Sequence, residues 1–358
     1  MRSVGVEEEL LLVDPDTGEP RAVSGAVLAF ADDDTRLEKE LQREQVETGT
    51  RPRTSMGDLA AEVLRWRREA AHRARQAGAE VAALATSPLP VEPSVSTGER
   101  YQRLRDEFRM TADEQLTCGC HVHVSVDSDE EGVAVLDRIR PWLAPLLALS
   151  ANSPFWQGRD SGHESYRTQV WGRWPSAGPV EVFGSPERYH HEVRTLLETG
   201  TLLDEGMIYF DARLSRSYPT VEIRVADVCL DRADTVLLAA LVRGLVETAS
   251  RAWQAGEPPA PVSARLLRLA AWRAARSGLT EELVHPLTWT PAPAGTVVRS
   301  LVDHVRTALT DAGDLELVKD GLAELLHRGN GAARQRARHT RTGSLRDVVT
   351  DAVSRTTA

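Results

Sequence analysis

Three consecutive glutamates interrupt an apolar segment near the N-terminus, which reads Val4-Gly5-Val6-Glu7-Glu8-Glu9-Leu10-Leu11-Leu12-Val13. The apolar residues around them predict a β-strand, in which successive side chains point to opposite faces. Glu7 and Glu9 therefore share one face of the strand. Two neighbouring carboxylates repel each other unless a cation lies between them, which indicates a site for a hard divalent metal such as Mg²⁺. A solvated acidic face on an exposed edge strand is the alternative.

Other predicted strands carry polar side chains at the same alternate spacing. They read Gln45-Val46-Glu47-Thr48, His121-Val122-His123-Val124-Ser125-Val126 and Thr220-Val221-Glu222-Ile223-Arg224-Val225. Two imidazoles on one face of an apolar strand suit metal ligation or phosphate contacts. Together, these strands indicate a sheet face that gathers carboxylates, imidazoles and arginines, as a metal and nucleotide site requires. Residues 207–212 are predicted to form one more strand.

Each pattern also has a simpler explanation. The histidines are equally typical of packed or hydrogen-bonded core residues, and Glu222 with Arg224 is typical of an ion pair on a solvent face. Cysteines and histidines within residues 118–123 suggest zinc, but a structural zinc site needs its ligand pairs to be separated by a loop. We therefore expect structural roles for the cysteines at 118 and 120. Residues 150–160 are either a substrate-binding loop or a solvent loop.

Helices are predicted from apolar residues that recur every three or four positions. The predicted ranges are 56–84, 99–115, 129–150, 188–204, 232–253, 262–277, 297–312, 315–328 and 344–354. Strands and helices are mixed in the first part of the chain, whereas the last part is helical throughout. We expect a catalytic part, residues 1–255, and a helical C-terminal portion, residues 256–358, that packs on it as one functional domain.

The composition limits the class of protein and its partners. The chain has 358 residues, of which 41% are hydrophobic and 27% are charged, as in a globular protein with a sizeable core. A formal net charge of −10 argues against nucleic acid as a partner. Three cysteines are too few for a disulfide framework, and no apolar stretch approaches the ~20 residues that span a bilayer. We therefore expect a cytoplasmic protein with no membrane partner.

In order along the chain, these motifs resemble those of the glutamate-cysteine ligase type 2 family of carboxylate-amine ligases. The resemblance rests on Gly5-Val6-Glu7-Glu8-Glu9-Leu10, Gln45-Val46-Glu47-Thr48, Glu99-Arg100-Tyr101, Cys118-Gly119-Cys120-His121-Val122-His123-Val124, Leu149-Ser150-Ala151-Asn152-Ser153-Pro154 and Thr220-Val221-Glu222-Ile223-Arg224-Val225. It implies an α+β fold similar to that of glutamine synthetase. Such a fold has a curved, mainly antiparallel sheet that carries the active site on one face and is backed by helices. Ser125 and Gly49 depart from the glycine and alanine that the family pattern usually has there.

The resemblance also implies an activity. ATP would phosphorylate the γ-carboxylate of L-glutamate, and an amine, by default L-cysteine, would then attack the acyl phosphate with Mg²⁺ or Mn²⁺ as cofactor. The implied metal ligands are Glu7, Glu9, Glu47, His121 and Glu222. The implied substrate or nucleotide contacts are His123, Arg167, Arg213 and Arg224. Arg224, Arg213 and Glu47 would take catalytic roles.

Two other functions stay open at this point. One is a zinc-dependent hydrolase that uses His121, His123 and a glutamate, and the other is a non-catalytic relative that only binds ATP. The acceptor amine is not encoded in any motif, because discrimination between small side chains is worth only ~1–3 kcal/mol. A homodimer is a further expectation, from the surplus of amphipathic helices.

Overall fold

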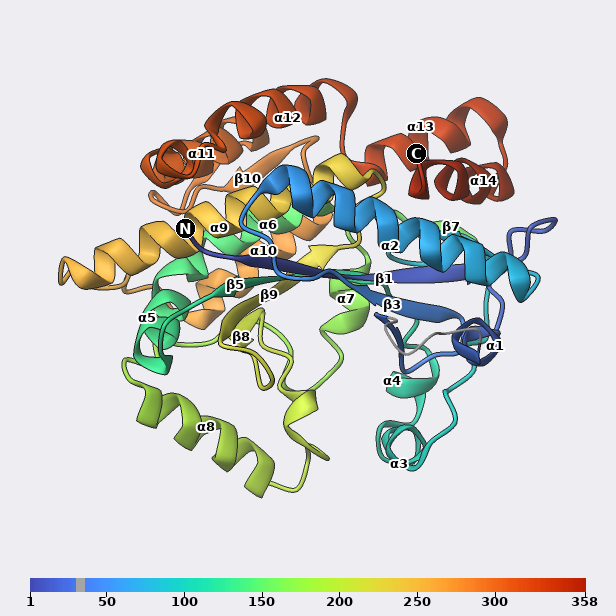
Figure 1. The fold of residues 1–358 in the computed structure, drawn as a ribbon, viewed down its shortest axis with the longest axis horizontal. Coiled ribbons are helices and arrows are strands. Elements are labelled where there is room, and N and C mark those ends of the chain that lie inside the picture. The colour runs from blue at the N-terminus through green and yellow to red at the C-terminus, as the bar shows by residue number, and fades with distance from the viewer. Residues whose placement is uncertain (30–35) are drawn as a thin grey trace.

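An antiparallel sheet runs through the middle of the computed structural model, which describes residues 1–29 and 36–358 (Figure 1). Within those residues the sheet has seven strands in the order β2-β3-β1-β5-β9-β8, and β4 also pairs with β1. The strands are β1 Val4–Val13, β2 Leu37–Lys39, β3 Gln45–Gly49, β4 Glu80–Ala82, β5 Gly119–Ser125, β8 Ala212–Leu214 and β9 Thr220–Asp227. Strands β1 and β9 thus begin at the predicted residues.

The register of the central strands places the polar side chains beside one another. Glu9 of β1 lies opposite Glu47 of β3, and Glu7 lies opposite His121 of β5. On the other side of β5, His123 lies opposite Glu222 of β9. Because residues two apart on a strand share a face, the register alone gathers carboxylates and imidazoles on one face of the sheet.

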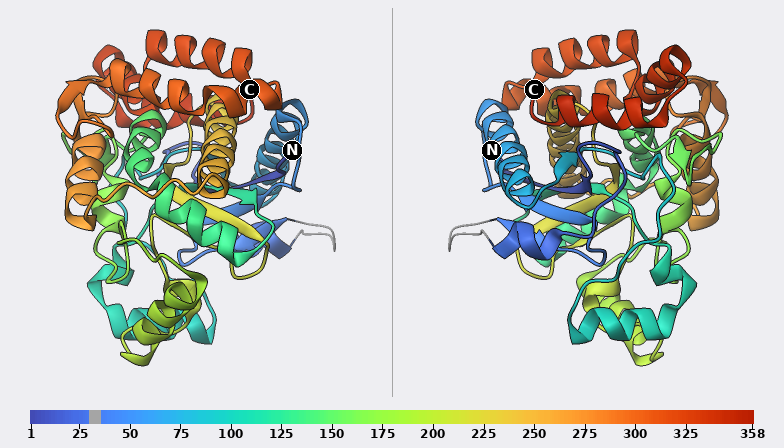
Figure 2. Two further views of the ribbon diagram at one scale, coloured as in Figure 1. Left: turned by 90° about the vertical axis from the view of Figure 1, so that its left-hand side faces the viewer. Right: turned by 90° about the vertical axis from the view of Figure 1, so that its right-hand side faces the viewer.

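Helices cover the opposite face, onto which Glu8 points. The face is covered first by α2 (Met56–Gln76) and α9 (Arg232–Gln254), and α11 (Ala294–Ala312) and α12 (Leu315–Arg328) pack on α9 (Figures 1 and 2). The main core lies between these layers and is built from buried valine, leucine and alanine side chains of the sheet and of α9. The site face is therefore the only side of the central strands that the helical layers leave free within the described residues.

Glu8 is held from behind by a buried arginine. The Arg67 side chain on α2 is fully buried, and its Nε and Nη2 each donate to a different Glu8 carboxylate oxygen at 2.7 Å. Thr235 of α9 donates a third hydrogen bond to Glu8 at 2.7 Å. Since Glu8 lies between Glu7 and Glu9, this contact fixes the strand segment that carries both site carboxylates.

Shorter helices and loops border the site face. Helices α3, α4 and α8 lie on the far side of the sheet from the C-terminal helices (Figure 2). The remaining elements are α1 Ser24–Ala29, α3 Glu99–Phe108, α4 Met110–Asp113, α5 Asp129–Ile139, η1 Arg140–Trp142, α6 Leu143–Ser150, β6 Phe155–Trp156, β7 Arg159–Asp160, α7 Arg167–Trp171, α8 Pro186–Glu198, η2 Glu205–Met207, α10 Ala264–Ser277, β10 Glu282–Val284, β11 Pro291–Pro293, α13 Gly331–Thr342 and α14 Leu345–Thr356.

Several predicted boundaries were wrong for identifiable reasons. The helix predicted over 56–84 ends at Gln76, because Gly78 has a φ of 71° and the next residues form β4. The helix predicted over 99–115 is broken at Arg109, whose φ is 48°. Pro141 lies where the helix predicted over 129–150 divides into α5, η1 and α6.

Other elements were misread or missed. Residues 207–212 do not form the predicted strand, because η2 ends at Met207 and β8 begins only at Ala212. Helix α13 was missed, since its arginine-rich segment has no regular apolar stripe. The α+β class, the antiparallel sheet with its helical backing and the helical C-terminal portion are confirmed. Across the described ranges, no helix is long and apolar enough to cross a membrane.

Candidate active site

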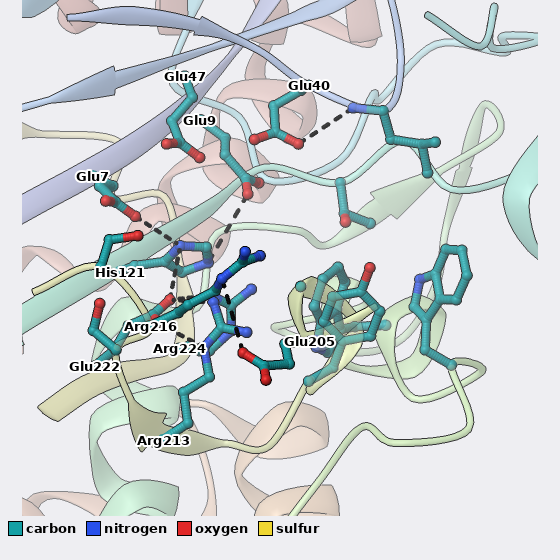
Figure 3. Close-up of a pocket in the computed structure, with 18 of the residues that line it drawn as sticks. Glu7, Glu9, Glu40, Glu47, His121, Glu205, Arg213, Arg216, Glu222 and Arg224 are labelled. Atoms are coloured by element: carbon teal, nitrogen blue, oxygen red, sulfur yellow. Dashed lines mark hydrogen bonds and ion pairs between the residues drawn. The ribbon is translucent and has the colours of Figure 1, made fainter. Parts of the chain in front are cut away.

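A cavity of about 340 Å³ opens on the free face of the sheet. Its wall contains all five predicted metal ligands, together with His123, Arg213 and Arg224. In Figure 3, Glu9, Glu40 and Glu47 lie together on one side of His121, whereas Glu222 and the arginines lie on the other. Side chains from β1, β3, β5, β8 and β9 therefore meet in one cavity, although they lie far apart in the sequence.

The two histidines lie among the carboxylates. Oε2 of Glu7 is 3.5 Å from Nδ1 of His121 and 3.3 Å from Nε2 of His123. His121 also lies 3.9 Å from Glu9 and 3.8 Å from Glu222. Burial, and then the Arg224 cation, lower the pKa of His121 to about 4, so this imidazole is neutral at pH 7 and offers a lone pair.

Among the residues that the structure describes, three groups of side chains have the geometry to hold metal ions. Each brings three ligand atoms within 4.8 Å of one another; the groups are Glu7/His123/Glu222, Glu7/Glu47/His121 and Glu9/Glu40/Glu47. Among the described residues, no group forms a hydrogen bond with the buried Nε2 atoms of His121 and His123, as expected of atoms that would bind a cation. Carboxylate-rich groups of this kind fit Mg²⁺ or Mn²⁺ better than zinc.

At the acidic end of the cavity, formed by Glu9, Glu40 and Glu47, the pKa values also fit a bound cation. Burial and then the neighbouring Glu40 raise the pKa of Glu47 well above its usual range. Burial and the neighbouring Glu9 raise the pKa of Glu40 to about 7. Burial and mutual repulsion thus favour the protonated forms of these carboxylates, and a bound divalent ion would favour the ionised forms instead.

Two arginines hold Glu222 at the other end of the cavity. Arg213 Nε donates to Glu222 Oε2 at 2.7 Å, and Arg224 Nη1 donates to Glu222 Oε1. Burial raises the pKa of Glu222, but the two guanidinium groups outweigh it and hold that pKa well below its usual range. A register shift between β5 and β9 lies at the level of Arg224. Such irregularities re-aim side chains at functional sites.

A second cavity of about 440 Å³ meets the first at Glu7, Glu47 and His123. Its floor includes Gly5 and Gly49, and nothing lies within 4 Å of the place where a Cβ of Gly49 would stand. The loop between β8 and β9 contributes to both cavities through Tyr218, whose side chain is 58% exposed. Glu7 and Glu47 therefore line both cavities.

Arg167 is placed differently from the other predicted site residues. It does not line the main cavity; it is 2% exposed and lines a smaller recess behind Trp171 and Arg224. A Cβ added to Gly119 would stand 2.3 Å from Arg167 Nη2, so glycine is required for this close approach. The Gly119 amide donates to Glu9 at 2.6 Å, which places Arg167 directly behind a predicted metal ligand. Direct contact between Arg167 and substrate stays a prediction.

The segment 150–160 has an internal role. Asn152 is fully buried and donates from Nδ2 to the carbonyls of Ala83 and Val228 at 2.9 and 2.8 Å. Its side-chain oxygen accepts a hydrogen bond from Gln335 of α13 at 2.7 Å. None of residues 150–160 lines the main cavity. The alternative of a substrate-binding loop is therefore wrong for this cavity, and Asn152 and Ser153 bond instead to the protein interior.

Several cavity residues were missed by the sequence reasoning. Glu40 lies with Glu9 and Glu47, and Gln115, Trp171, Trp174 and Tyr209 also line the cavity. Glu40 lies outside any strand, so no alternation distinguishes it from other nearby glutamates. The aromatic residues come from irregular segments and short helices, where spacing carries no information on direction.

A sheet face of carboxylates, imidazoles and arginines that borders two cavities has the donor groups that divalent ions and phosphate groups require, as in enzymes of phosphoryl transfer. Glutamate-cysteine ligase family 2 (GCS2) matches the chain over residues 3–351. The chain belongs to this family of ATP-dependent carboxylate-amine ligases.

Relatives with similar sequences support this assignment. The "Putative glutamate--cysteine ligase 2-1" of Streptomyces avermitilis is 62% identical over 360 residues, which cover 99% of both chains. The "Putative glutamate--cysteine ligase 2" of Streptomyces coelicolor is 61% identical over 362 residues, which cover all of both chains. These relatives match essentially the whole chain.

Solved structures show the same fold at low sequence identity. The glutamate-cysteine ligase of Francisella tularensis, solved in complex with AMP, superposes with a TM-score of 0.71 at 13% identity, covering 100% of this chain and 89% of that one. The bifunctional glutathione synthetase of Pasteurella multocida gives a TM-score of 0.70 at 14% identity, covering 99% of this chain and 52% of that one.

Proposed function

We propose that this protein uses ATP and Mg²⁺ or Mn²⁺ to phosphorylate the γ-carboxylate of L-glutamate and transfers the glutamyl group to an amine, by default L-cysteine. The observation that carries the proposal is the meeting of Glu7, Glu9, Glu47, His121 and Glu222 in one cavity beside two arginines. The coarser activity, ATP-dependent ligation of a carboxylate to an amine, is that of the family.

The chemistry requires a carboxylate to become an electrophile. The γ-carboxylate oxygen attacks the terminal phosphorus of ATP, the bond to ADP breaks, and an acyl phosphate forms. The amine nitrogen then attacks the acyl carbon, the bond to phosphate breaks, and inorganic phosphate and a proton leave. Divalent ions bound by the carboxylates and His121 would supply charge neutralisation for the anions that meet here.

The protein's own groups have distinct tasks in this scheme. Arg224 and Arg213 lie at the Glu222 end, where their cations would stabilise the charge on the transferred phosphoryl group. Glu47 belongs to two of the three ligand groups and would contribute a ligand to an ion in each of them. His123 lies at the junction of the two cavities, which suits a contact with nucleotide phosphate.

The domain organisation and the cellular setting are proposed on related grounds. Residues 256–358 pack on the catalytic part through α11 and α9, and Gln335 bonds to Asn152, which supports one functional domain. All three cysteines are buried and unpaired, which supports a reducing, cytoplasmic setting. A homodimer stays a prediction.

The activity is tested with purified protein, ATP, Mg²⁺, glutamate and a panel of amines that includes cysteine. We expect ADP and phosphate release that depends on glutamate, with the ligated product identified by mass spectrometry. Glu222→Gln should abolish turnover and leave the circular dichroism spectrum unchanged. The proposal is refuted if no amine supports turnover. If Glu222→Gln stays active, Glu222 is not one of the metal ligands.

Metal analysis separates this proposal from a zinc-dependent hydrolase. The three ligand groups contain more carboxylates than imidazoles, so we expect weakly held Mg²⁺ or Mn²⁺ that dialysis removes. Stoichiometric zinc that survives dialysis would favour the hydrolase instead. ATP binding without phosphate release, measured by calorimetry, would favour a non-catalytic relative.

A further inference from the structure

Two buried arginines, one in the main cavity and one in the recess behind it, have few ionic partners. Arg224 is 7% exposed, and among the described residues its guanidinium donates a hydrogen bond only to Glu222, a carboxylate that it shares with Arg213. Arg167 is 2% exposed, and no carboxylate in the described part of the chain forms an ion pair with it. Nε of each arginine lacks a hydrogen-bond partner there. Buried charges are normally paired, so another group has to hold these two cations.

The indole ring of Trp171 is placed to hold both. The guanidinium carbon of Arg167 lies 5.5 Å from the ring centroid and that of Arg224 lies 5.9 Å from it, within the ~6 Å at which a cation is attracted to an aromatic face. Trp171 follows Arg167 by four residues on α7, the spacing that brings two side chains of a helix together. Trp171 also lines both the main cavity and the recess. Its π electrons therefore offset the repulsion between two like charges that have few carboxylate partners.

A buried aspartate fastens α7 to the strand that carries Arg224. Asp227 ends β9 and is fully buried. Its Oδ2 accepts a hydrogen bond from Ser153 Oγ at 2.7 Å, and its Oδ1 accepts one from Ser165 Oγ at 2.8 Å. Ser153 Oγ accepts in turn from the backbone N–H of Arg167, the first residue of α7, at 3.0 Å. The start of α7 is thus fixed against the end of β9, which sets where the indole lies relative to the arginine.

We propose that Trp171 is a positioning residue for phosphoryl transfer, which holds the Arg224 guanidinium toward the transferred phosphoryl group. The inference rests on the ligase function proposed above, in which Arg224 stabilises the charge on that group. In Figure 3, Arg224 lies beside Glu222, its one carboxylate partner in the described residues. Without the indole, the guanidinium is held by Glu222 alone and is repelled by Arg167. Trp171 acts through Arg224 and needs no contact of its own with a reacting atom.

Nucleotide binding tests this role without any turnover. ADP lacks the phosphoryl group that Arg224 is proposed to contact, whereas the non-hydrolysable ATP analogue AMP-PNP has it. Calorimetry with Mg²⁺ should show that Trp171→Leu lowers the affinity for AMP-PNP about 10-fold and leaves that for ADP within about twofold. Trp171→Phe keeps an aromatic face and should lose no more than about threefold. Trp272→Leu is the matched control, because Trp272 is 48% exposed on α10 and lines neither the main cavity nor the recess.

Combination with a change of Arg224 shows whether the effect passes through that residue. Arg224→Met should abolish the preference for AMP-PNP over ADP, and adding Trp171→Leu should then have no further effect. An equal loss of affinity for both nucleotides would show a merely structural role for Trp171 and overturn the inference. An unchanged preference in Trp171→Leu, or a loss in Trp171→Phe as large as that in Trp171→Leu, would overturn it as well.

Turnover keeps this inference separate from the ligase proposal. In the active enzyme, Trp171→Leu should lower the kcat of ADP release about 10-fold, with the KM for the amine within about twofold. A rise in that KM with kcat unchanged would overturn the positioning role. If the wild type binds AMP-PNP no more tightly than ADP, the task proposed for Arg224 and this inference are both refuted. A preference that Trp171→Leu removes, in a protein that turns over no amine, supports the inference and refutes the ligase activity.

Discussion

Replacing Arg67 by methionine should both destabilise the protein and weaken its metal site. The change leaves the Glu8 carboxylate, whose side chain is 2% exposed, without the cation that donates two 2.7 Å hydrogen bonds to it. Removing one partner of a buried ion pair costs about 3–5 kcal/mol, so we expect a loss near 4 kcal/mol in the free energy of unfolding. Urea denaturation followed by tryptophan fluorescence measures this loss.

Two further variants make the experiment decisive. Arg75→Met is the control, because Arg75 lies on the same helix but pairs with Glu80 at the surface, where such a pair is worth about 0–1 kcal/mol. Glu8→Gln combined with Arg67→Met removes both charges, and the pair should cost much less than the sum of the single changes. If Arg67→Met lowers the free energy of unfolding as little as the control does, the Arg67–Glu8 ion pair does not stabilise the protein as proposed.

The same change has a functional consequence, because Glu8 lies between two proposed metal ligands. When β1 is no longer fixed from behind, Glu7 and Glu9 lose their orientation, as happens when groups behind a metal ligand are removed. We expect the Mg²⁺ concentration for half-maximal ADP release to rise about 10-fold in Arg67→Met. If Arg67→Met is destabilised but needs no more Mg²⁺ than the wild type, the Arg67–Glu8 ion pair contributes to stability alone.

Three other changes probe the surroundings of the site. Burial and Glu9 raise the pKa of Glu40 from 4.5 to about 7. Because the folded state then binds the proton more tightly than the unfolded state, the metal-free protein should lose stability as the pH rises between those values. Glu40→Gln should reduce this dependence of stability on pH, measured by thermal unfolding in the presence of EDTA. An unaltered dependence would assign it to other groups. Asn152→Ala leaves two buried carbonyls without donors and should cost about 2–4 kcal/mol in urea denaturation, whereas a loss below about 1 kcal/mol would contradict this role. Gly119→Ala forces the Arg167 guanidinium to move and should lower turnover about 10-fold through Glu9; full activity would show that the close approach is not needed.

The predictable part of the site was the part that lies on regular strands. Alternation on β1 and β9 fixes which face each side chain takes, so Glu7, Glu9 and Glu222 could be grouped before their distances were known. Glu40 and Trp174 come from irregular segments, where no periodicity relates sequence spacing to direction. Their place in the cavity depends on tertiary packing, which local sequence does not encode.

The errors in the fold have similar causes. The apolar stripe of α2 continues past Gln76, but Gly78 and the pairing of β4 with β1 end the helix. Arg167 was grouped with the cavity arginines by residue type, although its close contact with Gly119 places it behind Glu9. In both cases a long-range contact overrides the local preference.

The strand order of the sheet also has a consequence for synthesis of the chain. The central strand β1 is made first, but its neighbour β5 pairs on the other side with β9, which follows β1 by roughly 200 residues. At the usual pace of translation, roughly 10–40 s pass before this half of the sheet can close. During that time the open strand edge on the nascent chain belongs to β5, whose apolar Val122 and Val124 have no β9 to pair with. Ribosome-bound chains shorter than about 230 residues should therefore depend on chaperones far more than the finished protein does.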